Sequence, residues 1–239
     1  MGKMLQFLGR GSAFADENNS AFFVNGNELV LVDFPMSSFM KLRRFGADKL
    51  AGVKNADITV IVTHTHGDHA GGVATLIHFA FYVLHRKVTV IAPSEEVAAD
   101  LKYLIERIEG CDPEGYELVT ADKAQRPWLL DVIPTTHAPQ LAGRCFGYHL
   151  LVEGNNVVYT GDTATIEPFL PYLTAGTYLY ADSAASGSPV HLGVTELLEK
   201  VKGLDIKLYL MHLDQPATIF DIAEGTGAAA APLFDQKKR

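Results

Sequence analysis

The feature that most constrains this chain is a run of six residues, HTHGDH at positions 64–69, that follows a stretch of β-branched residues. The preceding residues 58–63 (ITVIVT) have the composition of a buried strand. In extended backbone, side chains two residues apart point the same way, so His64 and His66 can bind one metal ion together. Gly67 permits a sharp turn, after which the aspartate and the last histidine of the run can face a second ion. The run therefore predicts a pair of metal sites at the end of a strand.

Three further candidate ligands lie at the ends of predicted strands. His137 follows residues 129–134, Asp162 lies in the segment YTGDT, and His212 follows residues 208–211. Because α/β proteins place ligand sites at the carboxyl ends of strands, we expect these side chains to meet the HTHGDH run. Imidazole and carboxylate groups are the ligands that zinc prefers. A carboxylate between two cations partly neutralises their repulsion, so we expect Asp162 to bridge them.

Short apolar segments alternate with helical patterns along the chain. We expect strands at residues 28–34, 58–63, 88–92, 129–134, 146–152, 157–160, 178–181 and 206–211. We expect helices at residues 73–84, between Ser94 and Gly110, and at 195–201, with a hairpin turn at 154–156. This order predicts an α/β protein with mixed sheets covered by helices. We expect a single domain over residues 1–224 and a C-terminal tail, partly disordered, over residues 225–239.

Composition limits the function and the location of the protein. The chain has 239 residues and a formal net charge of −8, which disfavours a global surface for polyphosphates. The two cysteines, Cys111 and Cys145, make no disulfide framework and fit a reducing compartment. The longest apolar run, residues 76–84, is too short to span a membrane, and the N-terminus lacks the pattern of a signal peptide. We therefore expect a soluble cytoplasmic protein with no membrane partner.

The order of the candidate ligands resembles the pattern of the metallo-β-lactamase superfamily. The HTHGDH run, a later histidine, a Gly-Asp pair at a strand end and a final histidine all match it, over nearly the whole chain. The resemblance implies an αββα sandwich, in which two mixed sheets pack together with helices outside. It also implies the ligand sets: His64, His66 and His137 on metal one, Asp68, His69 and His212 on metal two, and Asp162 bridging both.

Asp33 is similar to an acidic residue that the superfamily carries at the end of an early strand. The resemblance implies that Asp33 holds a metal ligand in place instead of binding metal itself. From the residues alone, an exposed aspartate in a turn is the alternative.

Two segments resemble the RNase Z-like branch of the superfamily. Residues 7–14 (FLGRGSAF) and Asn19-Ser20 are similar to the start of that branch, and residues 191–195 (HLGVT) resemble its additional histidine motif. In such phosphodiesterases this histidine assists the scissile phosphate and the leaving oxygen, so His191 is a candidate catalytic residue. A structural residue at the start of a helix is the alternative.

The substrate implied by the resemblance is a small-molecule or nucleotide-type phosphodiester. RNase Z carries a long arm that grips tRNA, and the chain has no such insertion. The acidic net charge also disfavours tRNA, because phosphate contacts require lysine and arginine. The sequence itself does not give the oligomeric state; many relatives resemble dimers, so the resemblance suggests a homodimer.

The implied chemistry is binuclear metal-dependent hydrolysis. Two cations held close together lower the pKa of a bridging water, so that hydroxide exists near neutral pH. We expect Asp68 to orient this nucleophile as well as to bind metal, and His191 to donate a proton to the leaving group. Zinc is the expected metal, with manganese and iron as alternatives that the ligand types also permit.

Two other functions remain open. The same ligands could serve a carboxylic ester, lactone or thioester hydrolase, although acyl-homoserine lactonases carry tyrosine three residues after the bridging aspartate, where this chain has Thr165. Flavodiiron proteins usually have glutamate in place of His66, which argues against redox iron. A non-catalytic metal-binding scaffold is the second alternative, weakened because all seven ligand positions hold competent residues.

Overall fold

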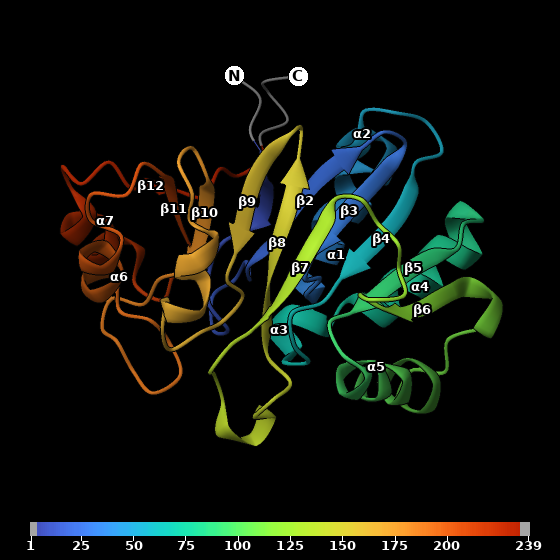
Figure 1. Cartoon of the computed structure of the whole chain (residues 1–239). Helices are drawn as coiled ribbons and strands as arrows, with labels where there is room; N and C mark the ends of the chain where they lie inside the picture. The colour runs from blue at the N-terminus through green and yellow to red at the C-terminus, as the bar shows by residue number, and fades with distance from the viewer. Residues whose placement is uncertain (1–3, 235–239) are drawn as a thin grey trace.

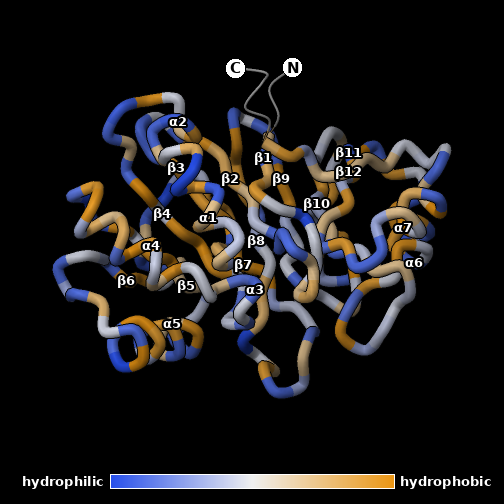
Figure 2. Tube along the Cα trace, turned by 180° about the vertical axis from the view of Figure 1, so that it is seen from behind, coloured by the Kyte–Doolittle hydropathy of each residue, from blue (hydrophilic) through white to orange (hydrophobic). Residues whose placement is uncertain are grey.

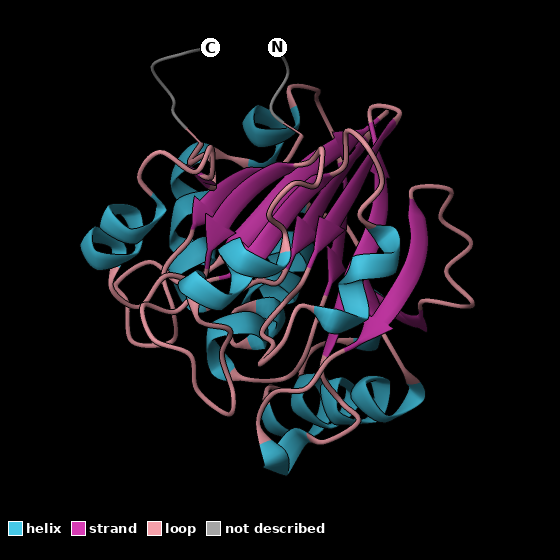
Figure 3. Ribbon diagram, turned by 60° about the vertical axis from the view of Figure 1, so that its left-hand side comes forward, coloured by secondary structure: helices cyan, strands magenta, loops and turns pink. Residues whose placement is uncertain are grey.

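The computed structural model describes residues 4–234. Over these residues the strands form two six-stranded sheets in the middle of the molecule, with helices on both outer sides (Figure 1; Figure 3). In spatial order, the first sheet contains β1(Gln6–Gly9), β2(Ser20–Asn25), β3(Glu28–Val32), β4(Asp57–Ile61), β5(Val88–Ala92) and β6(Tyr116–Thr120). The second contains β12(Ala229–Ala230), β11(Lys207–Met211), β10(Tyr178–Asp182), β9(Asn155–Tyr159), β8(Phe146–Val152) and β7(Leu129–Pro134). The predicted αββα sandwich of two mixed sheets is confirmed.

The two sheets follow the same order of pairing. In the first sheet β1, β2 and β3 are antiparallel neighbours, and β3 to β6 run parallel. In the second sheet β7, β8 and β9 are antiparallel neighbours, and β9 to β12 run parallel. Parallel neighbours end at the same edge of a sheet, so each half of the chain brings several strand ends together.

Helices cover the outer face of each sheet and bury its apolar side chains. The first sheet packs against α1(Met36–Phe45), α2(Ala47–Ala51), α4(Val73–Phe79) and α5(Glu95–Lys102), and the second against α6(Val194–Lys200) and α7(Pro216–Ala223). The helices α4 and α5 continue as the π-helical turns η1(Ala80–Leu84) and η2(Tyr103–Ile108). The remaining short helices are α3(Gly67–Ala70) and the 3₁₀ turns η3(Pro113–Gly115), η4(Pro139–Leu141) and η5(Glu167–Tyr172).

A second apolar layer fills the space between the sheets. Val30 and Ile61 from the first sheet are fully buried there against Tyr148, Tyr159 and Tyr180 from the second. Strand side chains alternate between faces, so these residues point inward while their neighbours pack against the helices. Figure 2 shows the same pattern, with hydrophobic colour along the central strands and hydrophilic colour in many outer loops.

The hairpin turn lies one residue earlier than predicted. The strand β8 ends at Val152 and β9 begins at Asn155, so the turn consists of Glu153 and Gly154. Both residues have positive φ, 48° and 76°, as a two-residue hairpin turn of type I′ requires. The sequence prediction also missed β1, β2, β6 and β12, and the helices α1, α2 and α7.

Residues 225–234 of the predicted tail are described by the structure, whereas residues 235–239 lie outside the described residues. The described part contains β12, which pairs with β11, and the backbone N–H of Ala231 donates to the carbonyl of Leu210. The N–H of Phe234 donates to the carbonyl of Phe7 at 2.9 Å, so this segment contacts both sheets. Among the described residues, no helix has both the length and the apolar character needed to cross a membrane.

Candidate metal centre

The HTHGDH run begins three residues after the end of β4 and forms a sharp turn into α3. His66 is extended, with φ of −60° and ψ of 149°, and α3 begins at the next residue, Gly67. The backbone N–H of His69 donates to the carbonyl of His66 at 3.0 Å, which closes the turn. His64 and His69 are buried, so the turn directs two imidazole rings into the protein.

Three imidazole rings and one carboxylate form the first cluster. The Nε2 atom of His64 lies 3.0 Å from Nδ1 of His66, and Nε2 of His137 lies 3.3 Å from the same atom. The Oδ2 atom of Asp162 lies 3.9 Å from Nε2 of His64 and 3.6 Å from Nε2 of His137. All four ligand atoms lie within 4.8 Å of one another, which is the spacing that a single cation could fill.

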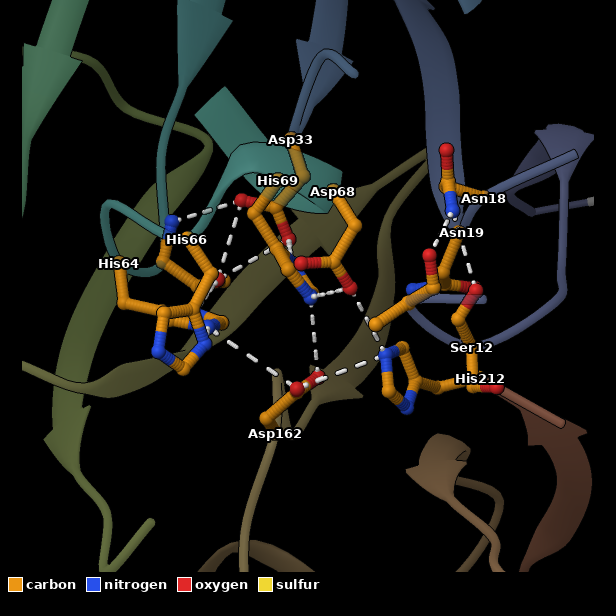
Figure 4. Close-up of polar contacts among 12 residues, drawn as sticks. Ser12, Asn18, Asn19, Asp33, His64, His66, Asp68, His69, Asp162 and His212 are labelled. Carbon is orange, nitrogen blue, oxygen red and sulfur yellow. Dashed lines mark hydrogen bonds and ion pairs between the residues drawn. The ribbon is translucent and has the colours of Figure 1, made fainter. Parts of the chain in front are cut away.

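The second cluster shares Asp162 with the first. The Oδ2 atom of Asp68 lies 3.3 Å from Nε2 of His69 and 3.3 Å from Nε2 of His212. Asp162 places Oδ1 3.2 Å from His69 and Oδ2 3.4 Å from His212. The close-up in Figure 4 shows the Asp162 carboxylate between the two groups of side chains. The structure thus brings together all seven residues that the sequence predicts as ligands.

The donor atoms of the clusters fit divalent cations. Among the described residues, the buried atoms His69 Nε2 and Asp162 Oδ1 have no hydrogen-bond partner, and both point into the second cluster. Unpaired buried polar atoms are costly unless an ion or a water satisfies them. Imidazole nitrogens and carboxylate oxygens together suit zinc, and they also suit manganese or iron.

Asp33 lies behind the clusters and contacts the candidate ligand His69. It is fully buried, which excludes an exposed turn, and it has a φ of 56°. Its Oδ2 atom accepts a hydrogen bond from Nδ1 of His69 at 2.9 Å, and its carboxylate also accepts from the backbone N–H and hydroxyl of Thr63. The hydroxyl of Tyr159 donates to Oδ2 at 3.3 Å, and the amide of Asn19 donates to that hydroxyl at 2.7 Å. This network fixes the ring of His69 with Nε2 toward the second cluster.

Two other candidate ligand rings contact the protein through Nδ1. Nδ1 of His137 donates to the backbone carbonyl of Val190 at 2.7 Å. Nδ1 of His212 lies 3.3 Å from Oδ1 of Asp182. In His137 the hydrogen-bonded Nδ1 leaves Nε2 facing the cluster, and in His212 Nδ1 faces the Asp182 carboxylate while Nε2 faces the cluster.

The electrostatics of the clusters favour anionic carboxylates. Burial raises the pKa of Asp68, but a hydrogen bond from His212 and the nearby imidazole of His69 outweigh it and hold the pKa well below its usual range. Burial, together with the neighbouring His69, holds the pKa of His64 well below its usual value, so His64 is neutral. Burial lowers the pKa of His212, yet Asp162 and the other carboxylates outweigh it and raise the pKa to about 10. A proton on His212 is one that a bound cation would displace.

His191 lies beside both clusters but belongs to neither. It precedes α6, its side chain is 27% exposed, and it can therefore be reached from solvent. Its ring centre lies 4.9 Å from that of His137 and 5.1 Å from that of His212. Its Nδ1 atom lies 2.9 Å from Oδ2 of Asp182, and this carboxylate raises the pKa of His191 against the lowering effect of burial.

The sequence reasoning missed Asp182, Tyr159 and the structural role of Asn19. Asp182 is the last residue of β10, so it occupies the same kind of position as the predicted ligands. The prediction ended that strand at Ala181, and the rule that selected Asp162 could have selected Asp182 as well. No sequence signal distinguishes Tyr159 from the other buried tyrosines.

The chain matches the family model described as Anti-Pycsar protein Apyc1 over residues 3–230. A relative of that name from Bacillus phage 010DV004 is 27% identical over 235 residues, covering 87% of this chain and 88% of the relative. One from Saccharibacillus brassicae is 26% identical over 228 residues, with the same coverage of 87% and 88%. A protein of Pyrococcus furiosus named UPF0173 metal-dependent hydrolase is 24% identical over 151 residues, covering 61% of this chain and 59% of that protein.

Solved structures with the same fold cover almost the whole chain. The metallo-β-lactamase fold protein YhfI of Bacillus subtilis has a TM-score of 0.76 at 18% identity, covering 96% of this chain and 97% of that one. The short form of human tRNase Z has a TM-score of 0.66 at 15% identity, covering 97% of each chain. These structures confirm the predicted metallo-β-lactamase fold. The name of the Pyrococcus furiosus relative agrees with the predicted class, a metal-dependent hydrolase. The chain has the metallo-β-lactamase fold and belongs to the family described as Anti-Pycsar protein Apyc1.

Proposed function

We propose that the chain is a binuclear metal-dependent phosphodiesterase. The observation that carries this proposal is the pair of clusters that share one carboxylate, Asp162. A shared carboxylate keeps two cations close while it neutralises part of their repulsion. This arrangement suits the in-line displacement at a phosphorus atom, in which the attacking and the leaving oxygen both carry negative charge.

The ligand assignment follows the two clusters. His64, His66 and His137 would hold metal one, Asp68, His69 and His212 would hold metal two, and Asp162 would bridge them. We propose zinc as the metal, because zinc favours sites rich in histidine; manganese and iron are the alternatives. Asp33 would keep His69 in the orientation that binding requires.

Two residues at the clusters would bind the attacking water and protonate the leaving oxygen. When bound, the two cations would supply an activated water and neutralise charge on the phosphoryl oxygens. Asp68 would hold the attacking water by accepting a hydrogen bond, in addition to binding metal. His191 stands beside both clusters, partly exposed, and would donate a proton to the leaving oxygen.

The substrate that we propose is a small nucleotide-type phosphodiester, with cyclic nucleotides as the first class to test. Three features support a small substrate over tRNA: the acidic net charge of −8, the absence of a gripping insertion in the sequence, and relatives named Anti-Pycsar protein that match at similar length. A cyclic nucleotide is the smallest nucleotide with a phosphodiester, and its single phosphate needs few contacts from lysine or arginine.

We also propose a cytoplasmic location, a single domain over residues 1–224 and a homodimer. The two free, buried cysteines support a reducing compartment. Size-exclusion chromatography with light scattering tests the dimer, and a mass of one chain would contradict it.

The test combines metal content with activity. Purified protein is expected to contain about two metal ions per chain and to hydrolyse bis(p-nitrophenyl) phosphate and cyclic nucleotides until a chelator removes the metal. The variant His191→Ala should keep its metal and lose about 10²- to 10⁴-fold in kcat. His85→Asn, at an exposed histidine outside both clusters, is the matched control and should behave as the wild type.

The alternatives give different results. Two metal ions with activity only toward p-nitrophenyl acetate or a lactone would replace the proposal by an ester, lactone or thioester hydrolase. Absence of bound metal, with no activity after metal is added back, would leave only a scaffold.

A further inference from the structure

An aromatic side chain stands fully in solvent on the loop between β1 and β2, residues 10–19. Phe14 is 102% exposed, so no other side chain covers its ring. It lies in a turn that is closed by a hydrogen bond from the N–H of Ala15 to the carbonyl of Ser12 at 3.1 Å. The residues on either side, Ala13 and Ala15, are too small to pack over the ring. The ring is therefore open to contact with a planar ligand.

The loop adjoins the candidate metal centre on the side of the second cluster. The N–H of Ser12 donates to the carbonyl of Leu213 at 3.0 Å, and Leu213 directly follows His212, a residue of that cluster. Phe14 is only two residues from Ser12, a backbone reach of at most about 7 Å. Figure 4 shows Ser12 and Asn18, from the two ends of the turn, in the same close-up as His212. The exposed ring thus belongs to the surroundings of the centre.

Hydrogen bonds hold this loop in one conformation. The side-chain amide of Asn18 donates to the carbonyls of Ser12 and Ala13, at 3.0 and 3.1 Å. The backbone N–H of Asn18 donates to the hydroxyl of Ser37 in α1 at 3.1 Å, and that hydroxyl donates to the side-chain oxygen of Asn18 at 3.1 Å. A group that is already held in place loses less conformational freedom when a ligand binds. The loop therefore suits Phe14 to a binding role.

We propose that Phe14 is a specificity-determining residue that stacks on the nucleobase of the substrate. This inference rests on the proposed function, the hydrolysis of a nucleotide-type phosphodiester at the two clusters. The imidazole and carboxylate groups of the clusters would be taken up by the cations, and the cations would attract the phosphate. The base needs a different kind of surface, and bases stack favourably on aromatic rings. Phe14 would therefore favour diesters that carry a base over diesters that do not.

The variant Phe14→Ala should weaken the binding of nucleotide substrates and leave base-free substrates unaffected. For cyclic AMP we expect KM to rise about 5- to 100-fold, the range that corresponds to the loss of one stacked base. The kcat should change little, because the stack is the same in the ground state and in the transition state. For 1-deoxyribose 3′,5′-cyclic phosphate, which has the same phosphodiester ring and no base, neither constant should change. Steady-state kinetics with the metal-loaded protein measure both substrates.

Two further variants serve as controls. Phe14→Trp keeps an aromatic face and should keep KM for cyclic AMP close to that of the wild type. Tyr82→Ala is the matched control, because it removes a 60% exposed aromatic side chain from η1, which continues α4 away from the HTHGDH run. It should leave the kinetics of both substrates unchanged. Since the ring of Phe14 is fully exposed, Phe14→Ala should also keep the Tm of the wild type.

A fluorescent base reports the contact without an assay of catalysis. The fluorescence of 2-aminopurine falls when it stacks on an aromatic ring. On rapid mixing with the metal-loaded wild type, 2-aminopurine riboside 3′,5′-cyclic phosphate should be quenched before turnover. The quenching should persist in Phe14→Trp and Tyr82→Ala and be lost in Phe14→Ala.

Other outcomes overturn the proposal. An equal rise of KM for cyclic AMP and for the base-free substrate would mean that Phe14 shapes the centre and does not contact the base. An unchanged KM for cyclic AMP in Phe14→Ala would mean that the base binds elsewhere. A change of molecular mass in Phe14→Ala, with the quenching retained, would place the ring between two copies of the chain. If the wild type cleaves no phosphodiester, the proposed function fails, whereas the quenching still decides whether Phe14 contacts a base.

Discussion

At the scale of the residue, two positions at the candidate centre have a backbone conformation that most residues avoid. Asp33 and His212 have φ values of 56° and 55°, in the left-handed region. Such conformations cost free energy and persist only where the surroundings determine them strongly. For Asp33 these surroundings are the hydrogen bonds from Thr63, His69 and Tyr159. These hydrogen bonds thus stabilise the backbone conformation that places the carboxylate of Asp33 against the imidazole of His69.

The variant Tyr159→Phe tests this network. It removes the hydroxyl that joins Asn19 to Asp33, and leaves the buried amide of Asn19 with only the sulfur of Met211 as acceptor. We expect the free energy of unfolding to fall by about 1–3 kcal/mol. The affinity for the second metal ion should fall by up to about tenfold, because His69 is held less firmly.

Urea denaturation and chelator competition measure the two effects. Tyr172→Phe is the control, since the hydroxyl of Tyr172 is exposed and donates only to a surface carboxylate. Equal stability of the two variants would show that Tyr159 does not support the site.

The candidate metal ligands could be predicted at this scale, but most of the residues that contact them from behind could not. His64, His66, Asp68 and His69 fall within one short run, so local spacing alone reveals them. Asp33 and His191 were found only through a family resemblance. Asp182 and Tyr159 meet their partners across strands that are distant in sequence, and composition carries no sign of those contacts.

At the scale of the element, the last described segment joins the edges of both sheets. The strand β12 extends the second sheet, and Phe7 of β1, at the edge of the first, exchanges backbone hydrogen bonds with Pro232 and Phe234. The ring of Phe234 packs 5.6 Å from Phe22 and 5.3 Å from Phe45. The segment therefore pairs with both sheets and packs against the apolar core at their edges.

The variant Phe234→Ala measures the contribution of this segment. It removes a partly buried ring from contact with two aromatic neighbours, and we expect the free energy of unfolding to fall by about 1–3 kcal/mol. Thermal and urea denaturation give the value, and exposed Phe14 provides the control variant Phe14→Ala. A fall no larger than that of the control would support a domain that ends at residue 224.

The elements found from sequence are those with a strong local pattern. The strands β4 and β5 are rich in β-branched residues, and α5 has a serine N-cap that accepts from Val97. The missed strand β2 reads SAFFVN and is buried along most of its length, so it lacks alternation. The two residues of β12 are both alanine, and only the neighbouring strand makes them extended.

At the scale of the whole molecule, the candidate centre draws on both halves of the chain. The HTHGDH run and Asp33 follow strands of the first sheet, whereas His137, Asp162 and His212 follow strands of the second. The halves share an order of pairing, and their strand ends meet where the sheets adjoin. Cations bound there would tie the two sheets together.

Removal of metal should therefore destabilise the whole fold. A cation present at about a thousand times its Kd adds about 4 kcal/mol to the stability of the folded state. For a chain of this size, that corresponds to a rise in Tm of about 10 °C. Differential scanning calorimetry with and without chelator measures the shift, and it should reverse when metal is restored. An unchanged Tm would show that the sheets do not depend on the centre.

The shared position of Asp162 also shapes how such a centre can evolve. A change at His66 or His212 alters one cluster and leaves the other complete, so a lineage can pass through forms with a single ion. A change at Asp162 alters both clusters in one step, so neither cluster stays complete. Substitutions that lead to a new metal or a new reaction can thus act on one cluster at a time at the unshared positions, whereas a substitution of Asp162 acts on both.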